Sequence, residues 1–274
     1  MVKISIVTIS YNQFQFLPRC VASIEGQIYT DYEHIVVDPG STDGSREWLG
    51  SHTHTHPRMR VVTKSDESPA EGLNNGLNAV GGELFMYLNA DDELAPNALA
   101  DIAEMHDQLP NVDVVIGNGW TIDSDGLPLR FVKSDRFSVT RYLLDVGTVL
   151  QQSTVFKTRV FQNGLRFNES NRYSWDIELL IDAKRLGAVI RNVPRTWGYF
   201  RLHGGSITMS SKYRRALRLE HLRLTKELTK LPAWSLKMAS YPARIGKKIT
   251  NFVIKAGPAE PFPGLVKGPM VETK

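Results

Sequence analysis

Short apolar runs and amphipathic segments alternate through the first third of the chain. The runs 3–9, 34–38 and 84–88 have the length and continuity of buried strands. Segments 14–26 and 70–80, which lie between them, carry apolar residues at helical spacing. Strands and helices that alternate with short links build a parallel sheet with helices on both faces. The pattern therefore predicts an α/β fold with a mostly parallel sheet.

The remainder of the first 210 residues continues the pattern with longer loops. Its predicted helices are 137–144 and 175–186, and its predicted strands are 112–116, 151–156, 189–193 and 196–201, with a hairpin over 120–129.

The run 84–88 ends abruptly in the polar residues Asn89, Asp91 and Asp92. In an open α/β sheet, ligands bind at the carboxyl ends of the strands. Oxygen ligands of this kind suit Mg²⁺ or Mn²⁺. The alternative is that Asp91 or Asp92 caps a helix over 93–105. Asp38 ends a second strand that opens onto the same edge, which favours a binding site.

Composition indicates a globular protein in a reducing compartment. The 274 residues are 42% hydrophobic and 23% charged, which is typical of a soluble protein and suits one domain with an appendage. The single cysteine, Cys20, excludes an internal disulfide. No window of about 18 uncharged apolar residues predicts a membrane span. We expect a cytoplasmic protein.

Charge divides the chain into an acidic body and a basic tail. Residues 211–274 hold 14 Lys/Arg and 4 Asp/Glu, a net charge of +10, so residues 1–210 carry −6. We expect a basic helix over 213–231, an amphipathic interfacial segment over 232–256 and a disordered end. Such a tail predicts peripheral binding to an anionic membrane surface. A solvated appendage or an oligomer contact is the alternative.

Three alternating histidines, His52, His54 and His56, raise the question of a metal site. The threonines between them and Pro57 after them favour an exposed loop instead. No Gly-Lys-Ser/Thr follows Gly40 and Gly44, so a phosphate-binding glycine-rich loop is not predicted.

Five separated motifs together resemble glycosyltransferase family 2. They are Ile4-Ser-Ile-Val-Thr-Ile-Ser-Tyr-Asn12, Val37-Asp-Pro-Gly-Ser-Thr-Asp-Gly-Ser45, Leu88-Asn-Ala-Asp-Asp92, Trp175-Asp-Ile-Glu-Leu179 and Phe200-Arg-Leu-His-Gly-Gly-Ser206. The resemblance spans roughly residues 3–210 and implies the GT-A fold, which is Rossmann-like, for a domain 1–210. It does not cover the extension 211–274.

The resemblance implies a nucleotide pocket near the first two strand ends. Tyr11 would stack on the base, with Ser10 and Asn12 beside it, and Asp38 would accept a hydrogen bond from a ring N–H, for uracil the N3–H. The alternatives are a half-buried core aromatic for Tyr11 and a turn-forming role for Asp38. Glu71 would reach the nucleotide or donor sugar, although Glu71-Gly72 replaces the common Asp-Ala; the alternative is that the preceding serines cap a helix.

The resemblance also implies a divalent metal, Mn²⁺ or Mg²⁺, at a variant of the Asp-X-Asp motif. Asn89 stands in its first position and would contact ribose, whereas Asp91 would hold the metal that bridges the two phosphates. His203, on a Gly-Gly loop, would ligate the metal or a phosphate, or it is simply exposed. Asp92 is the less certain partner.

By the same resemblance, Asp176 would be the catalytic base that takes the proton of the acceptor hydroxyl in an inverting transfer. The family often has Glu-Asp here, whereas this chain has Trp175-Asp176. Glu178 is the fallback base, and the alternative is that Asp176 only begins a helix. Trp175, Glu178, Asp92 and Gln152 are weak candidates for contacts to the acceptor or donor sugar.

These observations predict a metal-dependent inverting glycosyltransferase of the hexosyl type. The donor would be a nucleotide sugar, most plausibly a UDP-sugar, and the acceptor a glycan or lipid-linked molecule in polysaccharide or glycolipid biosynthesis. One rival is a sugar nucleotidyltransferase, for which the chain lacks a glycine-rich N-terminal loop. The other is a non-catalytic, membrane-associated module that binds nucleotide or glycan. Nothing in the sequence predicts nucleic-acid binding.

Overall fold

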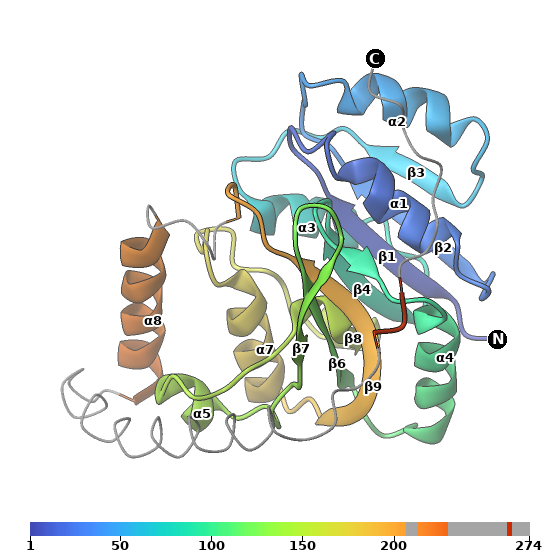
Figure 1. Ribbon diagram of the computed structural model, residues 1–274. Coiled ribbons are helices and arrows are strands. Elements are labelled where there is room, and N and C mark those ends of the chain that lie inside the picture. The colour runs from blue at the N-terminus through green and yellow to red at the C-terminus, as the bar shows by residue number, and fades with distance from the viewer. Residues whose placement is uncertain (207–212, 230–261, 265–274) are drawn as a thin grey trace.

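A nine-stranded sheet forms the centre of the protein in the computed structural model, which describes residues 1–206, 213–229 and 262–264 (Figure 1). The strands are β1 (Ile4–Ile9), β2 (Tyr32–Val37), β3 (Met59–Val62), β4 (Leu84–Asn89), β5 (Glu93–Leu94), β6 (Val114–Ile122), β7 (Pro128–Val132), β8 (Thr154–Lys157) and β9 (Ile190–Arg201). Their order is β3-β2-β1-β4-β8-β6-β9-β5, with β7 paired to β6.

Helices cover both faces of this sheet, as the sequence predicts. They are α1 (Leu17–Glu25), α2 (Ser45–Thr53), α3 (Pro69–Leu77), α4 (Ala98–Gln108), α5 (Val139–Leu143), α6 (Arg159–Gln162), α7 (Trp175–Arg185) and α8 (Arg214–Thr229), with a 3-10 turn η1 (Gln151–Ser153). Apolar residues of α1, α2 and α4 pack on one face, and those of α3 and α7 pack on the other. The expected α/β fold with a mostly parallel sheet is confirmed.

The register of the four leading strands brings three strand ends together. β1 pairs in parallel with β2 and with β4, and its last residue, Ile9, lies opposite Val37 on one side and Asn89 on the other. The polar residues that follow these positions, Ser10 and Asp38 among them, therefore meet at one edge. This edge is where an open α/β sheet binds its ligands.

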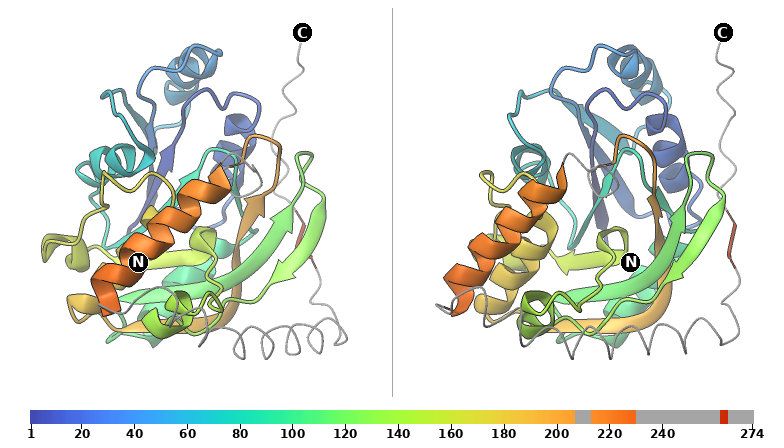
Figure 2. Two further views of the ribbon diagram at one scale, coloured as in Figure 1. Left: turned by 90° about the vertical axis from the view of Figure 1, so that its left-hand side faces the viewer. Right: turned by 60° about the vertical axis from the view of Figure 1, so that its left-hand side comes forward.

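The later strands curve away from this parallel half (Figure 2). Two strands predicted separately, over 189–193 and 196–201, form the single strand β9, which runs parallel to β6 with register shifts near Asn118. β8 is antiparallel to both β4 and β6 and joins the two halves of the sheet. The predicted hairpin exists as β6 and β7.

The structure corrects two interpretations of the sequence. Glu93 lies in strand β5, and α4 begins only after Asn97, so neither Asp91 nor Asp92 caps a helix over 93–105. The histidine run does not lie entirely in an exposed loop either, because α2 extends to Thr53 and includes His52.

The basic helix α8 packs against α7 (Figures 1 and 2). Arg223 of α8 forms an ion pair with the buried Glu178 of α7 at 2.7 Å, and the rings of His221 and Tyr142 lie 4.9 Å apart. The predicted interfacial segment 232–256 lies outside the described residues, as does all of the chain end except 262–264. Among the described helices, none is both long and apolar enough to cross a membrane.

Candidate active site at the carboxyl ends of β1, β2 and β4

Three buried oxygen atoms at this edge have no hydrogen-bond partner in the described structure. They are Ser10 Oγ after β1, Asp38 Oδ2 after β2 and Asn89 Oδ1 at the end of β4. Burying a polar atom without a partner costs free energy, so nearly all such atoms in folded proteins are paired. Three of them at one sheet edge indicate a site that a polar ligand completes.

Asp38 forms the turn after β2 with one carboxylate oxygen and leaves the other unpartnered. Its Oδ1 accepts hydrogen bonds from the backbone N–H of Gly40 at 2.9 Å and of Ser41 at 2.7 Å, which builds the turn after β2. Its Oδ2 remains available as an acceptor, although the side chain is fully buried. A fixed carboxylate of this kind selects a ligand N–H.

The loop after β1 is held against the turn after β2. Asn12 adopts a positive φ of 53°, donates its backbone N–H to Ser41 Oγ at 2.8 Å and accepts a hydrogen bond from the Thr42 N–H. Tyr11 is 61% exposed, so it is not a core aromatic. This arrangement fixes the loop and leaves an aromatic ring free on its outer side.

Asp91 and His203 come together across the same edge. His203 Nε2 lies 2.9 Å from Asp91 Oδ2, and the imidazole packs on the Phe16 ring with centroids 4.6 Å apart. A carboxylate and an imidazole side by side are donors that fit a divalent metal such as Mn²⁺, and the unpartnered Asn89 Oδ1 lies at the same strand end. The residues present therefore fit the expected cofactor.

Asp92 lies beneath this pair in a closed network. Its Oδ1 accepts from the Arg201 backbone N–H at 2.9 Å, and its Oδ2 accepts from Gln152 Nε2 at 2.7 Å and from Asn89 Nδ2 at 3.2 Å. Burial and the neighbouring Asp91 raise the pKa of its carboxyl. Both Asp92 and Gln152 are buried, so the structure places them behind the edge, where they orient Asn89.

Arg201, which the sequence did not single out, anchors the loop that carries Asp91. Its side chain is fully buried, pairs with Glu93 and donates Nε–H to the Asp91 carbonyl at 2.7 Å. It also donates to the carbonyls of Asp123 and Ser124 in the β6–β7 turn. The motif Phe200–Ser206 contained this residue, but a buried arginine cannot be told from a surface one by spacing alone.

Glu71 has a local role in the structure. The Glu71 N–H donates to Ser68 Oγ at 3.2 Å, and Glu71 Oε2 accepts from the Glu67 N–H at 2.8 Å. The Ser68 hydroxyl thus caps the start of α3, and the Glu71 carboxylate holds the backbone of the residue before the cap. The alternative of a serine cap is therefore confirmed.

Asp66, in the loop before α3, is the acidic residue that approaches Asp38. Burial, then Glu71 and Asp38, raise the pKa of Asp66 to about 6. A Cβ atom at Gly72 would lie 2.8 Å from Asp66 Oδ2, so only glycine leaves room for this side chain. In the sequence, Asp66 begins the stretch Asp66–Leu77 that resembles a motif of the family, and the resemblance pointed to Glu71 within it.

Asp176 is half-buried in the first turn of α7, and burial raises the pKa of its carboxyl. Burial also raises the pKa of the Tyr87 and Tyr142 hydroxyls, and the charge of Asp176 raises both further, so both phenols lie near it. Trp175 packs in the hydrophobic core. Of the two acidic side chains in the motif Trp175–Leu179, Asp176 is thus the one without a cationic partner in the described structure.

Glu178 is committed to other contacts. It accepts hydrogen bonds from Asn168 at 2.9 Å, from Asn171 at 2.5 Å and from Arg223 at 2.7 Å. Burial opposes the charged form, but the bonds from Arg223 and the two amides lower the pKa of Glu178 below its ordinary value. Such a carboxylate is a poor proton acceptor.

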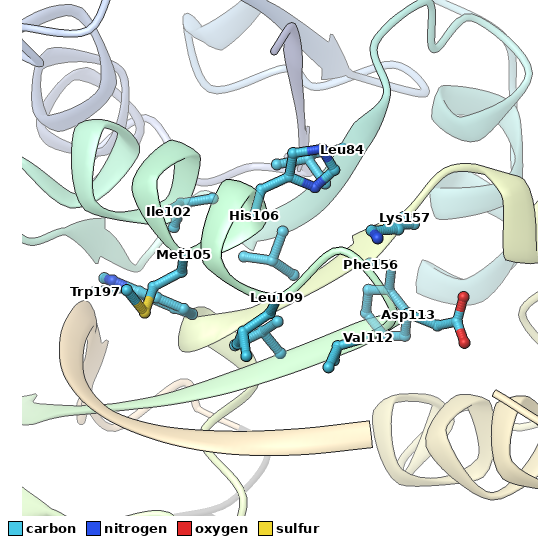
Figure 3. Close-up of a pocket in the computed structure, with 12 residues that line it drawn as sticks. Leu84, Ile102, Met105, His106, Leu109, Val112, Asp113, Phe156, Lys157 and Trp197 are labelled. Atoms are coloured by element: carbon cyan, nitrogen blue, oxygen red, sulfur yellow. The ribbon is translucent and has the colours of Figure 1, made fainter. Parts of the chain in front are cut away.

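An apolar pocket lies elsewhere, between α4 and strands β6, β8 and β9 (Figure 3). Its volume of about 10 Å³ holds no more than a water molecule. It borders Leu84, at the opposite end of β4 from Asn89, and it reflects imperfect packing of the core.

Both the sequence and the fold of the chain match known proteins. Residues 5–167 match glycosyl transferase family 2. An uncharacterized glycosyltransferase of Nostoc sp. is 24% identical over 220 residues, which are 76% of this chain and 67% of that protein. Further relatives are longer than this chain. The matched region covers 46% of the length of one relative and 32% of the length of another.

Two solved structures share the fold. S. aureus TarS 1–349 in complex with UDP-GlcNAc gives a TM-score of 0.64 at 17% identity, over 85% of this chain and 69% of that one. The mannosyltransferase PcManGT from Pyrobaculum calidifontis, in complex with GDP-Man and Mn²⁺, also gives 0.64 at 17% identity, over 94% of this chain and 76% of that one. At this identity the likeness establishes the GT-A fold.

Proposed function

The chain belongs to glycosyl transferase family 2 and is a glycosyltransferase, and we propose that it transfers a hexosyl group from a UDP-sugar with inversion and with help from a divalent metal. The observation that carries this proposal is the convergence of Asp91 and His203 beside the unpartnered oxygens of Asp38 and Asn89. Acceptor atoms for a base and ribose lie here next to ligands for a metal on the diphosphate.

The nucleotide occupies the ends of β1 and β2. Asp38 Oδ2 accepts the N3–H of uracil, Tyr11 stacks on the ring, and Asn12 holds the loop in place. Asn89 Oδ1 accepts from a ribose hydroxyl. TarS in complex with UDP-GlcNAc and PcManGT in complex with GDP-Man share this fold, which supports a nucleotide-sugar donor.

Asp91 and His203 hold the metal, with Mn²⁺ or Mg²⁺ as the candidates. When bound, such an ion neutralises negative charge on the leaving diphosphate. The Mn²⁺ in PcManGT supports this assignment. Arg201 keeps the backbone of Asp91 in position, and Asp92 fixes the side-chain amide of Asn89 beside it.

Asp176 takes the proton from the acceptor hydroxyl as that oxygen attacks the anomeric carbon and the nucleoside diphosphate leaves from the opposite face. Its raised pKa makes it a better proton acceptor than an ordinary carboxylate. Glu178 is excluded from this role by its ion pair with Arg223.

The acceptor is a glycan or a lipid-linked molecule, in polysaccharide or glycolipid assembly. The basic tail supports a setting at an anionic membrane surface, and α8 contributes the exposed residues Arg214, Arg215, Arg218 and Lys226 to it. The protein would thus work at the inner face of the cytoplasmic membrane.

Product analysis tests this function. The protein is incubated with UDP-, GDP- and dTDP-sugars, each with Mn²⁺ and a mixture of glycan and lipid-linked acceptors. Release of UDP together with a glycosylated product supports the proposal. Release of pyrophosphate from a sugar phosphate and UTP would identify a nucleotidyltransferase instead. UDP binding without turnover of any donor would identify a binding module.

A further inference from the structure

Glu25, His52 and His56 form a compact cluster away from the candidate active site. His52 Nε2 lies 2.9 Å from Glu25 Oε1, and His56 Nε2 lies 3.4 Å from Glu25 Oε2. One ligand atom from each residue lies within 4.8 Å of the other two. In the described structure, Glu25 pairs with these histidines and with no lysine or arginine.

The contacts of His56 fix where its ring proton lies. His56 Nδ1 is 3.1 Å from the His52 carbonyl oxygen, which can only accept, and 2.9 Å from Thr55 Oγ1. Thr55 Oγ1 itself donates to that carbonyl, so it too accepts from His56. The proton of a neutral His56 is therefore on Nδ1, and the Nε2 lone pair faces the Glu25 carboxylate. In this state two acceptors face each other, and either a proton on Nε2 or a metal ion between them satisfies both.

The two imidazole rings are held parallel to each other. The imidazoles of His52 and His56 stack with centroids 3.9 Å apart and an interplanar angle of 8°, and Trp48 stacks on the other face of His52. This stack presents Nε2 of both rings to the one carboxylate of Glu25, so a single metal ion can accept a lone pair from each of the three side chains.

We propose that Glu25, His52 and His56 form a second metal site, selective for a transition metal such as Zn²⁺. Two imidazoles and one carboxylate are an established ligand set for zinc, with a fourth position left to water. Bond lengths of about 2.0–2.1 Å in a tetrahedral shell place ligand atoms roughly 3.3 Å apart. The two contacts to Glu25, 2.9 and 3.4 Å, already have this scale.

The fold favours a cation at this place. Glu25 is the last residue of α1, and His52 lies in the last turn of α2, so the negative ends of two helix dipoles meet here. Both helices lie on one face of the sheet and share a core, with Leu17 and Val21 against Leu49 (Figure 1). A bound ion would therefore fasten α1 to α2 at the opposite end from the nucleotide pocket.

Metal binding by the untagged full chain in an Asp91→Ala background tests the proposal, because that change disables the expected catalytic metal site. Co²⁺ is titrated while its visible absorption is followed, and Zn²⁺ is then added. We expect one equivalent of Co²⁺ with the absorption of low-coordinate cobalt, displacement by Zn²⁺, and a higher Tm with Zn²⁺.

Matched variants in the same background assign the ligands. Glu25→Gln, His52→Asn and His56→Ala should each weaken binding at least about 10-fold and abolish the Zn²⁺-dependent rise in Tm. His54→Ala removes the exposed histidine between the two ligands and should leave both unchanged. Circular dichroism without metal confirms that each variant folds, and the exposed His54 provides the matched control for the loss of one imidazole. No binding in Asp91→Ala, or binding that survives His56→Ala, would overturn the proposal.

Discussion

His203 Nε2 lies 2.9 Å from Asp91 Oδ2, although 112 residues separate them in the sequence. The contact carries the loop after β9 onto the end of β4, beside the unpartnered oxygen of Asn89. The contact brings two side chains with metal-donor atoms together, as the proposed metal site requires.

Removing the imidazole should therefore weaken metal use without unfolding the protein. We expect His203→Ala to raise the Mn²⁺ concentration needed for half-maximal donor turnover by about 10- to 100-fold. Manganese titration of the activity measures this shift. His54→Ala, a change of an exposed histidine in the α2 region, is the control. An unaltered manganese requirement in His203→Ala would remove His203 from the metal site.

The two acids of α7 should behave differently. Asp176→Asn removes the proton acceptor and should lower kcat by roughly 10²–10⁴-fold, while UDP affinity measured by calorimetry stays unchanged. Glu178→Gln should retain most of the turnover and lose stability, because it breaks the pair with Arg223. If the two results were exchanged, Glu178 would be the base. Since Asp176 works deprotonated and its pKa is raised, the wild-type rate should fall as pH drops through that raised value.

Asp66 should make stability depend on pH in a recognisable direction. Its pKa is about 6 in the folded protein and lower in the unfolded chain, so between these values the folded state binds the extra proton. Stability is therefore greatest below the unfolded pKa and falls as pH rises to about 6. Asp66→Asn should be more stable than wild type at pH 8, with the difference shrinking by pH 4.5. Urea unfolding at both pH values measures this difference in stability. An equal difference at the two pH values would contradict the raised pKa of Asp66.

Arg201 should be among the most sensitive positions. Arg201→Met leaves Glu93 buried without its partner and frees three carbonyl groups, which should cost about 3–5 kcal/mol. Arg185→Met breaks an exposed pair with Asp182 and should change stability little. Denaturant unfolding compares the two variants. Similar stabilities would mean that the buried network does not hold the Asp91 loop.

The parallel half of the fold could be predicted well, because the pattern of apolar residues along the sequence follows their burial there. The runs before Asp38 and Asn89 are apolar on both faces, so the strands and their common edge followed directly. Strand β9 was harder: Pro194 interrupts its pattern, and the two extended segments looked separate.

Site residues that a motif places at a strand end could be predicted. Residues whose position depends on tertiary contacts were missed. Glu71 and Asp66 lie five residues apart, but the capping bonds of Glu71 and the space that Gly72 leaves for Asp66 depend on packing. The cluster of Glu25, His52 and His56 also depends on tertiary contacts and could not be predicted. Alternation suggested a loop, whereas the end of α2 brings His52 and His56 onto Glu25 of another helix.

The most direct test measures UDP release from the preferred UDP-sugar by wild type and Asp91→Ala, with Mn²⁺ and with EDTA. Asp125→Ala, which changes an exposed acidic residue of the β6–β7 turn, is the matched control. We predict release by wild type and Asp125→Ala with Mn²⁺, and none by either protein with EDTA or by Asp91→Ala. Release that is undiminished by EDTA and by Asp91→Ala would contradict the metal-assisted site on which this account depends.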